Sequence, residues 1–500
     1  MAKIFESLRM RKPGYSAFDL SHEKKLSLNM GQLIPILHEE IVPGDHFKIN
    51  TEVMLRFAPM IAPVMHRVNV YVHYFFVPNR IIWTQWEEFI TGGQDGLSTP
   101  TMPTITYNSQ VGVGTLGDYL GIGGTVSGGV YNPELNALPF RAYQEIFNEY
   151  YRDPNIDAVV DITSESAAAS LRTRRWEKDY FTSALPWSQR GPEVTLDGNI
   201  TYKQPAEGYL QYGGSDDNPI ADGQNVEGIA HATSGALGAN QSGSDNPIRI
   251  ENIDSLGITI NELRASSRLQ EWLEKNARGG YRYIEQILSH FGVRSSDSRM
   301  QRPEYLGGGR QPVVISEVLN TSATATEAQG TMAGHGISVG TANRARRKFE
   351  EHGQLLGIMS VMPRTGYQQG IPRKFLRADK LDYYWPEFAH LGEQEVESRE
   401  LYMHTGGTQE SNEEVFGYQQ RYAEYKYGCS TVHGDFRDTL DYWHMGRIFT
   451  TRPTLNNVFL AADPTDRIFA VTGGPDHLWC QVYNDVKARR PMPYFSNPRL

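Results

Sequence analysis

Two stretches near the start of the chain decide the fold, and the first reads HFKINTEVMLRF over His46–Phe57. Apolar residues and one threonine fill every second position, while lysine, asparagine, glutamate and arginine fill most of the others. Because side chains of a strand point alternately to opposite faces, this pattern predicts a long strand buried on one face. The second stretch, RVNVYVHYFFV over Arg67–Val77, is apolar or aromatic at nearly every position and predicts a strand covered on both faces.

Further strands are predicted only near the other end of the chain. QLLGIMSVM over Gln354–Met362 reads as a buried strand, and Leu478–Val486 alternates like the first stretch. The apolar spacing between these regions predicts helices over Phe140–Tyr151, Ile260–Ala277 and Tyr283–Phe291. A sheet or barrel closed by such distant segments needs very long, partly helical connections.

Two polar stretches read as excursions from this core. Residues 92–130 are rich in glycine, threonine and serine, and residues 196–250 are richer still in glycine, asparagine, aspartate and serine. Because the second stretch has few apolar residues, it cannot build a large core of its own. We expect a loop insertion at 92–130 and a polar surface insertion at 196–250, within a single domain spanning residues 1–500.

The bulk properties describe an acidic globular protein. The chain has 500 residues, of which 39% are hydrophobic and 21% charged, and its net charge is −10. No apolar run reaches the roughly 20 residues that span a bilayer, and the first residues lack the apolar core of a secretory signal, so we expect no membrane insertion. The two cysteines, Cys429 and Cys480, are far apart in sequence and are predicted to be free thiols.

No motif indicates catalysis or a cofactor. Gly112–Gly117 matches G-x-G-x-x-G, but the preceding residues are too polar and proline-broken for the buried strand of a dinucleotide site. Metal-binding spacings such as H-E-x-x-H and C-x-x-C are absent from the sequence. A structural calcium ion bound by loop carboxylates stays open, since such sites need no linear motif.

Basic clusters with neighbouring aromatic residues are the candidate contacts to nucleic acid. Positive charge beside aromatic rings suits single-stranded nucleic acid, although a solvated face or salt bridges to the many carboxylates would explain any one cluster. The candidate DNA-facing residues are Arg172, Arg174, Arg175, Arg344, Arg346, Arg347, Lys487, Arg489 and Arg490. Candidate subunit contacts are Trp83, Trp86, Tyr494 and Phe495, with core packing as the alternative for the two tryptophans.

Several long blocks resemble the major capsid proteins of the Microviridae, small single-stranded DNA bacteriophages, and in particular their gokushovirus-type branch. The blocks are residues 21–49, 58–93, 174–191, 269–309 and 352–373, together with the C-terminal part. The resemblance implies an eight-stranded antiparallel jelly roll with very long inter-strand loops. It also implies a T=1 icosahedral shell of about sixty copies around a circular DNA genome.

The resemblance further implies a set of partners and a location. A small basic virion protein and the inner capsid surface would hold the DNA, a minor pilot protein would accompany them, and a receptor on the host surface would be recognised. The gokushovirus-type surface protrusion at the three-fold axes would correspond to residues 196–250. Assembly is expected in the bacterial host cytoplasm and the product is the virion, with no catalytic residue and no cofactor.

A second class of function also fits the residues alone. β-Sandwiches rich in tyrosine and tryptophan bind sugars, so a lectin-like or carbohydrate-acting protein is the alternative. It predicts a small oligomer with an aromatic cleft and, if hydrolytic, two carboxylates about 5–10 Å apart.

Overall fold

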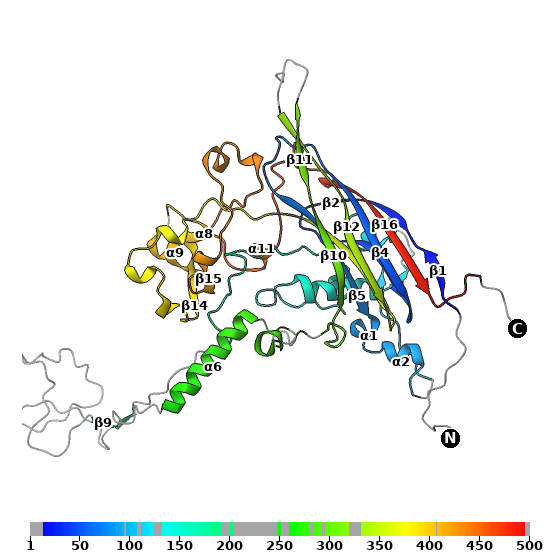
Figure 1. Cartoon of the computed structure of the whole chain (residues 1–500), viewed down its shortest axis with the longest axis horizontal. Coiled ribbons are helices and arrows are strands. Elements are labelled where there is room, and N and C mark those ends of the chain that lie inside the picture. Colours follow the sequence, from blue (N-terminus) through cyan, green and yellow to red (C-terminus); the bar gives the residue numbers. More distant parts are fainter. Residues whose placement is uncertain are drawn as a thin grey trace, which may run out of the picture. The chain divides into compact units, whose positions relative to one another are not determined.

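A computed structural model provides the structure and describes residues 14–94, 97–107, 112–123, 133–191, 201–203, 249–251, 260–279, 285, 287–292, 294, 296–319, 332–406 and 408–495. The chain forms two compact units (Figure 1). Met1–Ser188 and Ala277–Leu500 make the larger unit, and Gln189–Asn276 make the smaller one.

The larger unit contains a six-stranded antiparallel sheet. Its order is β1-β16-β4-β12-β11, and β2 also pairs with β16. The strands are β1 (Ser16–Asp19), β2 (His22–Leu28), β4 (His46–Phe57), β11 (Val314–Leu319), β12 (Met332–Lys348) and β16 (Leu478–Arg490). The strand predicted over His46–Phe57 is confirmed, and the one predicted from Leu478 continues past Val486 to Arg490.

A four-stranded antiparallel sheet lies opposite, in the order β10-β5-β13-β3. Its strands are β3 (Ile34–Ile41), β5 (Val68–Pro78), β10 (Glu304–Pro312) and β13 (Gly353–Pro363). Every residue of β13 is buried, and so is every residue of β5 except His73. The predictions for Arg67–Val77 and Gln354–Met362 are therefore confirmed.

The two sheets enclose the main hydrophobic core. Inward side chains from β4, β5, β13 and β16 meet in one cluster that includes Phe47, Leu55, Val70, Met359 and Val482. Along the chain, β2, β4, β12 and β16 belong to one sheet and β3, β5, β10 and β13 to the other, an order consistent with the predicted jelly roll. The mainly β, antiparallel fold class is confirmed, whereas these two sheets hold ten described strands and the count of eight is not confirmed.

A chain of buried hydrogen bonds crosses this core and joins the sheets. Tyr74 on β5 donates to Thr51 Oγ1 on β4 (2.5 Å), and Thr51 donates to Asn484 Oδ1 on β16 (2.9 Å). Asn484 Nδ2 then donates to the carbonyl of Ile36 on β3 (2.9 Å). Tyr74, Thr51 and Asn484 have no exposed surface, and burial raises the pKa of Tyr74 to about 12.

A second apolar cluster covers the outer face of the four-stranded sheet. Phe75 and Val77 on β5 and Leu356 and Ile358 on β13 contribute to it from the sheet. The covering elements are α1 (Asn79–Ile82), α2 (Trp86–Thr91), β6 (Thr104–Thr106), α3 (Leu116–Leu120), β7 (Glu134–Asn136), α4 (Leu138–Ile146), the π-helix η2 (Phe147–Tyr151) and α5 (Glu165–Ala168). The helix predicted over Phe140–Tyr151 is confirmed, with its last turn in π geometry.

The predicted insertion at 92–130 is described over residues 92–94, 97–107 and 112–123. Ile105 and Leu116 from it are buried in the second cluster. The G-x-G-x-x-G residues lead into the five-residue helix α3, and the ladders between named strands in the described part are all antiparallel. This is not the parallel βαβ setting that a dinucleotide site needs.

The long connection from β13 to β16 packs in a third apolar cluster, to which it contributes Val396 and Phe459 and an earlier segment contributes Phe181. It consists of short elements, namely η5 (Arg373–Phe375), η6 (Lys380–Asp382), η7 (Pro386–Phe388), β14 (Glu393–Glu397), α8 (Ser398–Leu401), α9 (Gln409–Glu413), β15 (Val415–Gln420), α10 (Ala423–Lys426), η8 (Gly434–Arg437), η9 (Asp441–Trp443) and α11 (Asn457–Leu460). β14 and β15 pair with each other.

Most of the predicted insertion at 196–250 lies outside the described residues. Its described ends are β8 (Thr201–Lys203) and β9 (Arg249–Glu251), which pair antiparallel, so the two ends of the stretch lie side by side. The next element, α6 (Ile260–Gly279), confirms the helix predicted over Ile260–Ala277, and η4 (Ile287–Phe291) falls within the third predicted helix. No helix in the described ranges is long and apolar enough to cross a membrane.

Candidate nucleic-acid interface

The six-stranded sheet leaves its outer face uncovered along most of β4 and β16. Residues of β4 alternate between buried and more exposed positions, and those of β16 do the same up to its last residue, Arg490. Phe47, Ile49 and Val486 point into the core, whereas Lys48 and Lys487 are exposed. We call the outward surface of β4, β12 and β16 the free sheet face.

Strand pairing gathers basic residues at one end of this face. Lys48 on β4 pairs with Arg346 on β12 and with Lys487 on β16. In the next row His46 pairs with Lys348 and Arg489, and in the row on the other side Asn50 pairs with Arg344. Since neighbouring strands lie about 4.8 Å apart, charges from three distant segments share one small surface. We call Lys48, Arg344, Arg346, Lys348, Lys487 and Arg489 the basic end of the free sheet face.

Most of this charge is available to a ligand. In the described part of the chain, no carboxylate lies within ion-pair distance of Lys48, Arg344, Arg346 or Lys348. Lys487 is the exception, because its ammonium lies 2.5 Å from Asp19 and 3.4 Å from Asp485. The hydrogen bond raises the pKa of Lys487 and lowers that of Asp19 to about 2.

A shallow hollow lies within the basic end. Its lining includes Phe18 on β1, His46 and Lys48 on β4, Arg346 on β12 and Arg489 on β16. The Arg489 guanidinium lies 5.0 Å from the ring centre of Tyr15. Farther along the same face, Trp479 and Tyr483 on β16 are exposed. Cations and flat rings therefore occur together on one surface, as stacking of single-stranded bases requires.

Two predicted DNA-facing residues on these strands have internal partners instead. Arg347 forms an ion pair with Glu304 at 2.9 Å. Arg490 donates to the Glu40 carbonyl at 2.8 Å and lies 3.5 Å from the buried Asp45 carboxylate, whose pKa is raised by burial. Both side chains join elements of the larger unit.

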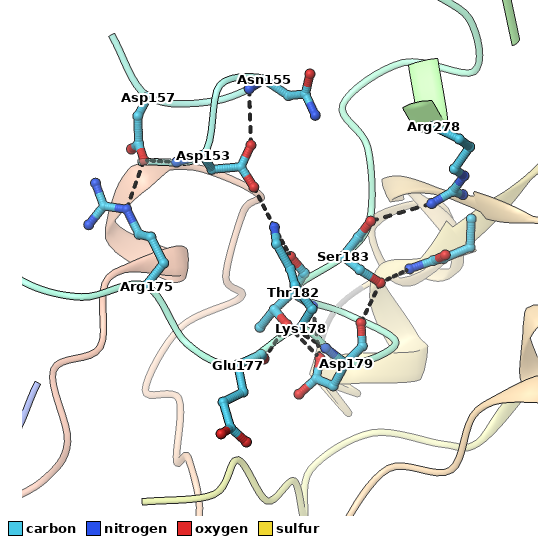
Figure 2. Close-up of polar contacts among 11 residues, drawn as sticks. Asp153, Asn155, Asp157, Arg175, Glu177, Lys178, Asp179, Thr182, Ser183 and Arg278 are labelled. Atoms are coloured by element: carbon cyan, nitrogen blue, oxygen red, sulfur yellow. Dashed lines mark hydrogen bonds and ion pairs between the residues drawn. The ribbon is translucent and has the colours of Figure 1, made fainter. Parts of the chain in front are cut away.

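The first three predicted DNA-facing residues lie elsewhere, beside the start of β3. They are Arg172, Arg174 and Arg175. Figure 2 shows Arg175 bonded to Asp157, at 2.7 Å, and Lys178 bonded to Asp153. Arg174 donates to Ser360 Oγ at 2.9 Å and lies 4.3 Å from the ring centre of Tyr71.

Arg172 is held in the same way. It donates to Gln144 Oε1 at 2.7 Å and to the Ala167 carbonyl at 2.9 Å. Burial lowers the pKa of its guanidinium. The structure thus brings together predicted residues from two distant strands, β12 and β16. It gives Arg172, Arg174 and Arg175 internal partners instead.

Sequence reasoning missed Lys48 as a member of the basic end of the free sheet face. The alternation of His46–Phe57 already placed Lys48 on the polar side of its strand. Its neighbours across the ladder, however, are separated from it by about 300 and 440 residues, so only the strand pairing reveals the group.

The four predicted subunit contacts fall into two kinds. Trp83 is 7% exposed and packs in the second cluster with the half-buried Trp86, as the core-packing alternative proposed. Tyr494 and Phe495 are 66% and 73% exposed, and the Tyr494 ring stacks on Phe18. These tail aromatics retain the free surface that a contact between subunits needs.

Cys429 and Cys480 are free thiols, as predicted, and burial raises the pKa of each to about 12. Among the residues that the structure describes, no three His, Cys, Asp or Glu side chains are grouped so as to hold a metal ion. The structural calcium ion therefore stays a prediction.

Comparison with known proteins identifies the kind of protein to which this architecture belongs. The family model for "Capsid protein (F protein)" matches residues 10–500. The chain is 34% identical to Capsid protein VP1 of Chlamydia phage 1 and 36% identical to Capsid protein VP1 of Bdellovibrio phage phiMH2K. It is 30% identical to Capsid protein VP1 of Spiroplasma virus 4, and each of these matches covers 97% of this chain and 95% of the relative.

These matches extend over almost the whole chain, and all of them name a capsid protein. Their names describe a structural, non-catalytic component of a virus shell, which decides against the carbohydrate-acting alternative. The chain belongs to the capsid protein family of the Microviridae, on its gokushovirus-type branch.

Proposed function

We propose that this capsid protein assembles into a closed T=1 shell of about sixty copies around a circular single-stranded DNA genome. The family membership supports self-assembly into a capsid. The long connections between strands supply the surface for contacts between copies, and many repeated weak contacts give a stable closed shell.

The free sheet face is proposed to line the inside of this shell and to contact the DNA. The four-stranded sheet is covered on both sides, so it cannot offer a flat wall to the genome. The single observation that carries the proposal is the row formed by Arg346, Lys48 and Lys487, which places three cations side by side on an uncovered surface.

Charge segregation supports this orientation. The whole chain carries a net charge of −10, so most of its surface repels phosphate. The basic end of the free sheet face is a local exception. Trp479 and Tyr483 add ring surfaces on which unpaired bases could stack.

An acidic coat protein with one basic region leaves much of the genome charge to other cations. A small basic DNA-binding protein in the virion would supply them, and we include such a partner and a minor pilot protein in the proposal. We also propose that residues 196–250 form the surface protrusion at the three-fold axes, that a host surface receptor is bound from outside, and that assembly takes place in the bacterial host cytoplasm.

The test is the DNA content of particles formed by variants. Wild-type particles, counted by electron microscopy, should be closed shells with DNA inside. The double variant Lys48→Gln/Arg346→Gln should still form shells, with at least threefold less DNA per particle.

The matched control removes two cations from the exposed surface of α6, as Arg268→Gln/Lys275→Gln, and should leave the DNA content unchanged. Equal DNA content in all three proteins would refute the inward orientation of the free sheet face. Failure of the wild-type chain to form closed shells under any condition would refute the assembly.

A further inference from the structure

A second uncovered surface is aromatic and lies on the long connection between β13 and β16. Phe375, Tyr383, Tyr384, Trp385, Tyr425 and Tyr427, here called the aromatic patch, are each between 44% and 71% exposed. Monomeric proteins rarely expose so many large rings together. We infer that the aromatic patch is a principal contact between two copies of this chain in the shell.

Direct contacts join Tyr383, Tyr384 and Tyr425 into one surface. The rings of Tyr384 and Tyr425 lie 6.3 Å apart, and the Tyr425 hydroxyl accepts a hydrogen bond from the backbone of Tyr384. The Arg377 guanidinium lies 5.3 Å from the ring centre of Tyr383 and 4.3 Å from that of Tyr425. Phe375 and Tyr427 line one hollow together with Glu424, whose carboxylate pairs with Arg377 at 3.2 Å.

The patch is held rigidly from beneath. Trp385 Nε1 donates to the Lys380 carbonyl at 2.8 Å. Tyr422 is buried and has a positive φ of 62°, a conformation that is costly for a tyrosine, and its backbone N–H donates to Gln394 Oε1. Because the rings are already ordered, binding a partner costs them little conformational entropy.

The size of the patch fits a contact between proteins. A large aromatic side chain presents about 200 Å² when fully exposed, so six half-exposed rings offer on the order of 600 Å². A standard protein interface buries about 800 Å² on each partner. Tyrosine, tryptophan and arginine are also the residues that most often anchor such interfaces.

The charges favour a second copy over nucleic acid. Arg377 is paired with Glu424 at 3.2 Å, and Arg373 with the buried Glu400 at 2.9 Å. Lys374, whose ammonium lies 5.0 Å from the ring centre of Phe375, is an exposed cation beside the patch. Single-stranded DNA needs several unpaired cations beside the rings, and that combination occurs on the free sheet face. For a protein whose function is to associate with itself, another copy is the partner with matching chemistry. The inference therefore rests on the proposed self-assembly.

The first experiment compares two tryptophans with similar exposure. Trp385 is 44% exposed and donates its indole N–H to the carbonyl of Lys380, whereas Trp272 on α6 is 50% exposed and lies outside both the aromatic patch and the free sheet face. Trp385→Ala should raise the protein concentration needed for half-maximal shell formation at least tenfold. Trp272→Ala should change it less than twofold.

Two further measurements distinguish a lost contact between copies from a folding defect: the variant Phe375→Ser and oxidative footprinting. Phe375 is the most exposed ring of the patch, so its replacement should impair assembly while leaving the thermal unfolding of the unassembled subunit unchanged. In wild-type empty shells, Tyr384, Trp385 and Tyr425 should be oxidised at least fivefold more slowly than in unassembled subunits, while Trp479 should be unchanged within twofold.

Equal assembly by all variants, with equal oxidation of the patch in shells and free subunits, would overturn the inference. Protection of the patch by added single-stranded DNA in unassembled subunits would overturn it in favour of a nucleic-acid site. A wild-type chain that forms no shells would instead count against the proposed function, so the two failures are distinguishable.

Discussion

Asn484 is predicted to be one of the most costly polar residues to remove from this protein. It has no exposed surface, accepts a hydrogen bond from Thr51 and donates one to the Ile36 carbonyl, and its amide nitrogen also lies 3.3 Å from His22 Nε2. Asn484→Ala removes these bonds, so the buried Thr51 hydroxyl loses its acceptor and the buried Ile36 carbonyl loses this donor. Each lost bond costs about 1 kcal/mol, and each stranded group adds about 1–3 kcal/mol.

Because these contributions overlap, we expect a total loss of about 4 kcal/mol in the free energy of unfolding. The larger unit comprises roughly 400 residues, for which the entropy of unfolding is on the order of 0.9 kcal/mol per kelvin. The melting temperature of the unassembled subunit should therefore fall by about 4–5 °C. Calorimetry or circular dichroism during heating measures this shift.

Two further variants separate the hydrogen-bond chain from general damage to β16. Gln481→Ala, on the exposed face of the same strand, should cost less than about 0.5 kcal/mol. Thr51→Val in the Asn484→Ala background should cost about 1–2 kcal/mol less than in the wild type, because the hydrogen bond between Thr51 and Asn484 is already absent there. The reasoning fails if Asn484→Ala melts with the wild type, or if Gln481→Ala loses as much stability.

Three other perturbations have clear expected outcomes. Burial depresses the pKa of His73 to about 4 in the folded protein, so unfolding takes up a proton below the ordinary value of 6.5. Stability should therefore fall by up to about 3 kcal/mol as the pH drops from 6.5 to 4, and His73→Gln should flatten this fall in a pH series of melting temperatures. Gly370→Ala should lower the melting temperature by several degrees, because the new methyl group would meet the Glu400 carbonyl at 1.9 Å, whereas Gly428→Ala has no atom within 4 Å to meet and should be neutral. For binding of single-stranded DNA, Lys48→Gln/Arg346→Gln should reduce the slope of log affinity against log salt by about 1.4, and an unchanged slope would show that neither residue contacts phosphate.

The strands that sequence alone predicted share a simple property. β4, β5, β13 and most of β16 have long apolar or alternating stretches without interruption. β12 lacks such a stretch, because its register shifts between Gly340 and Asn343 and glycine and arginine occupy many of its positions. β2 was missed for a related reason, since its outward positions carry lysine and glutamate at the edge of the sheet. Period-two reasoning works only where the register is continuous and one face is apolar.

The functional surface was predictable only in parts. Runs of arginine and lysine were visible in the sequence, but the sequence does not show which runs meet. Arg344 and Arg347 belong to one run, yet Arg344 lies free beside Asn50 while Arg347 is paired with Glu304. The difference of a few positions along a strand decides whether a cation faces a ligand or closes an ion pair. Trp83 shows the same limit for aromatic residues, since burial in the second cluster follows from the tertiary packing of α1 and α4.

Under the proposed function, the two facing sheets explain why one side of this protein can contact the genome and the other cannot. A helical layer buries the outer face of the four-stranded sheet, so substitutions there would act through stability. The six-stranded sheet has the opposite organisation, because its inward residues hold the core and its outward residues are free to carry charge. Basic substitutions on the free sheet face therefore cost little folding energy and add directly to phosphate binding. Under the proposals made above, an acidic capsid protein keeps a local basic surface for DNA in this way, while its loops, including the aromatic patch, carry the contacts between copies.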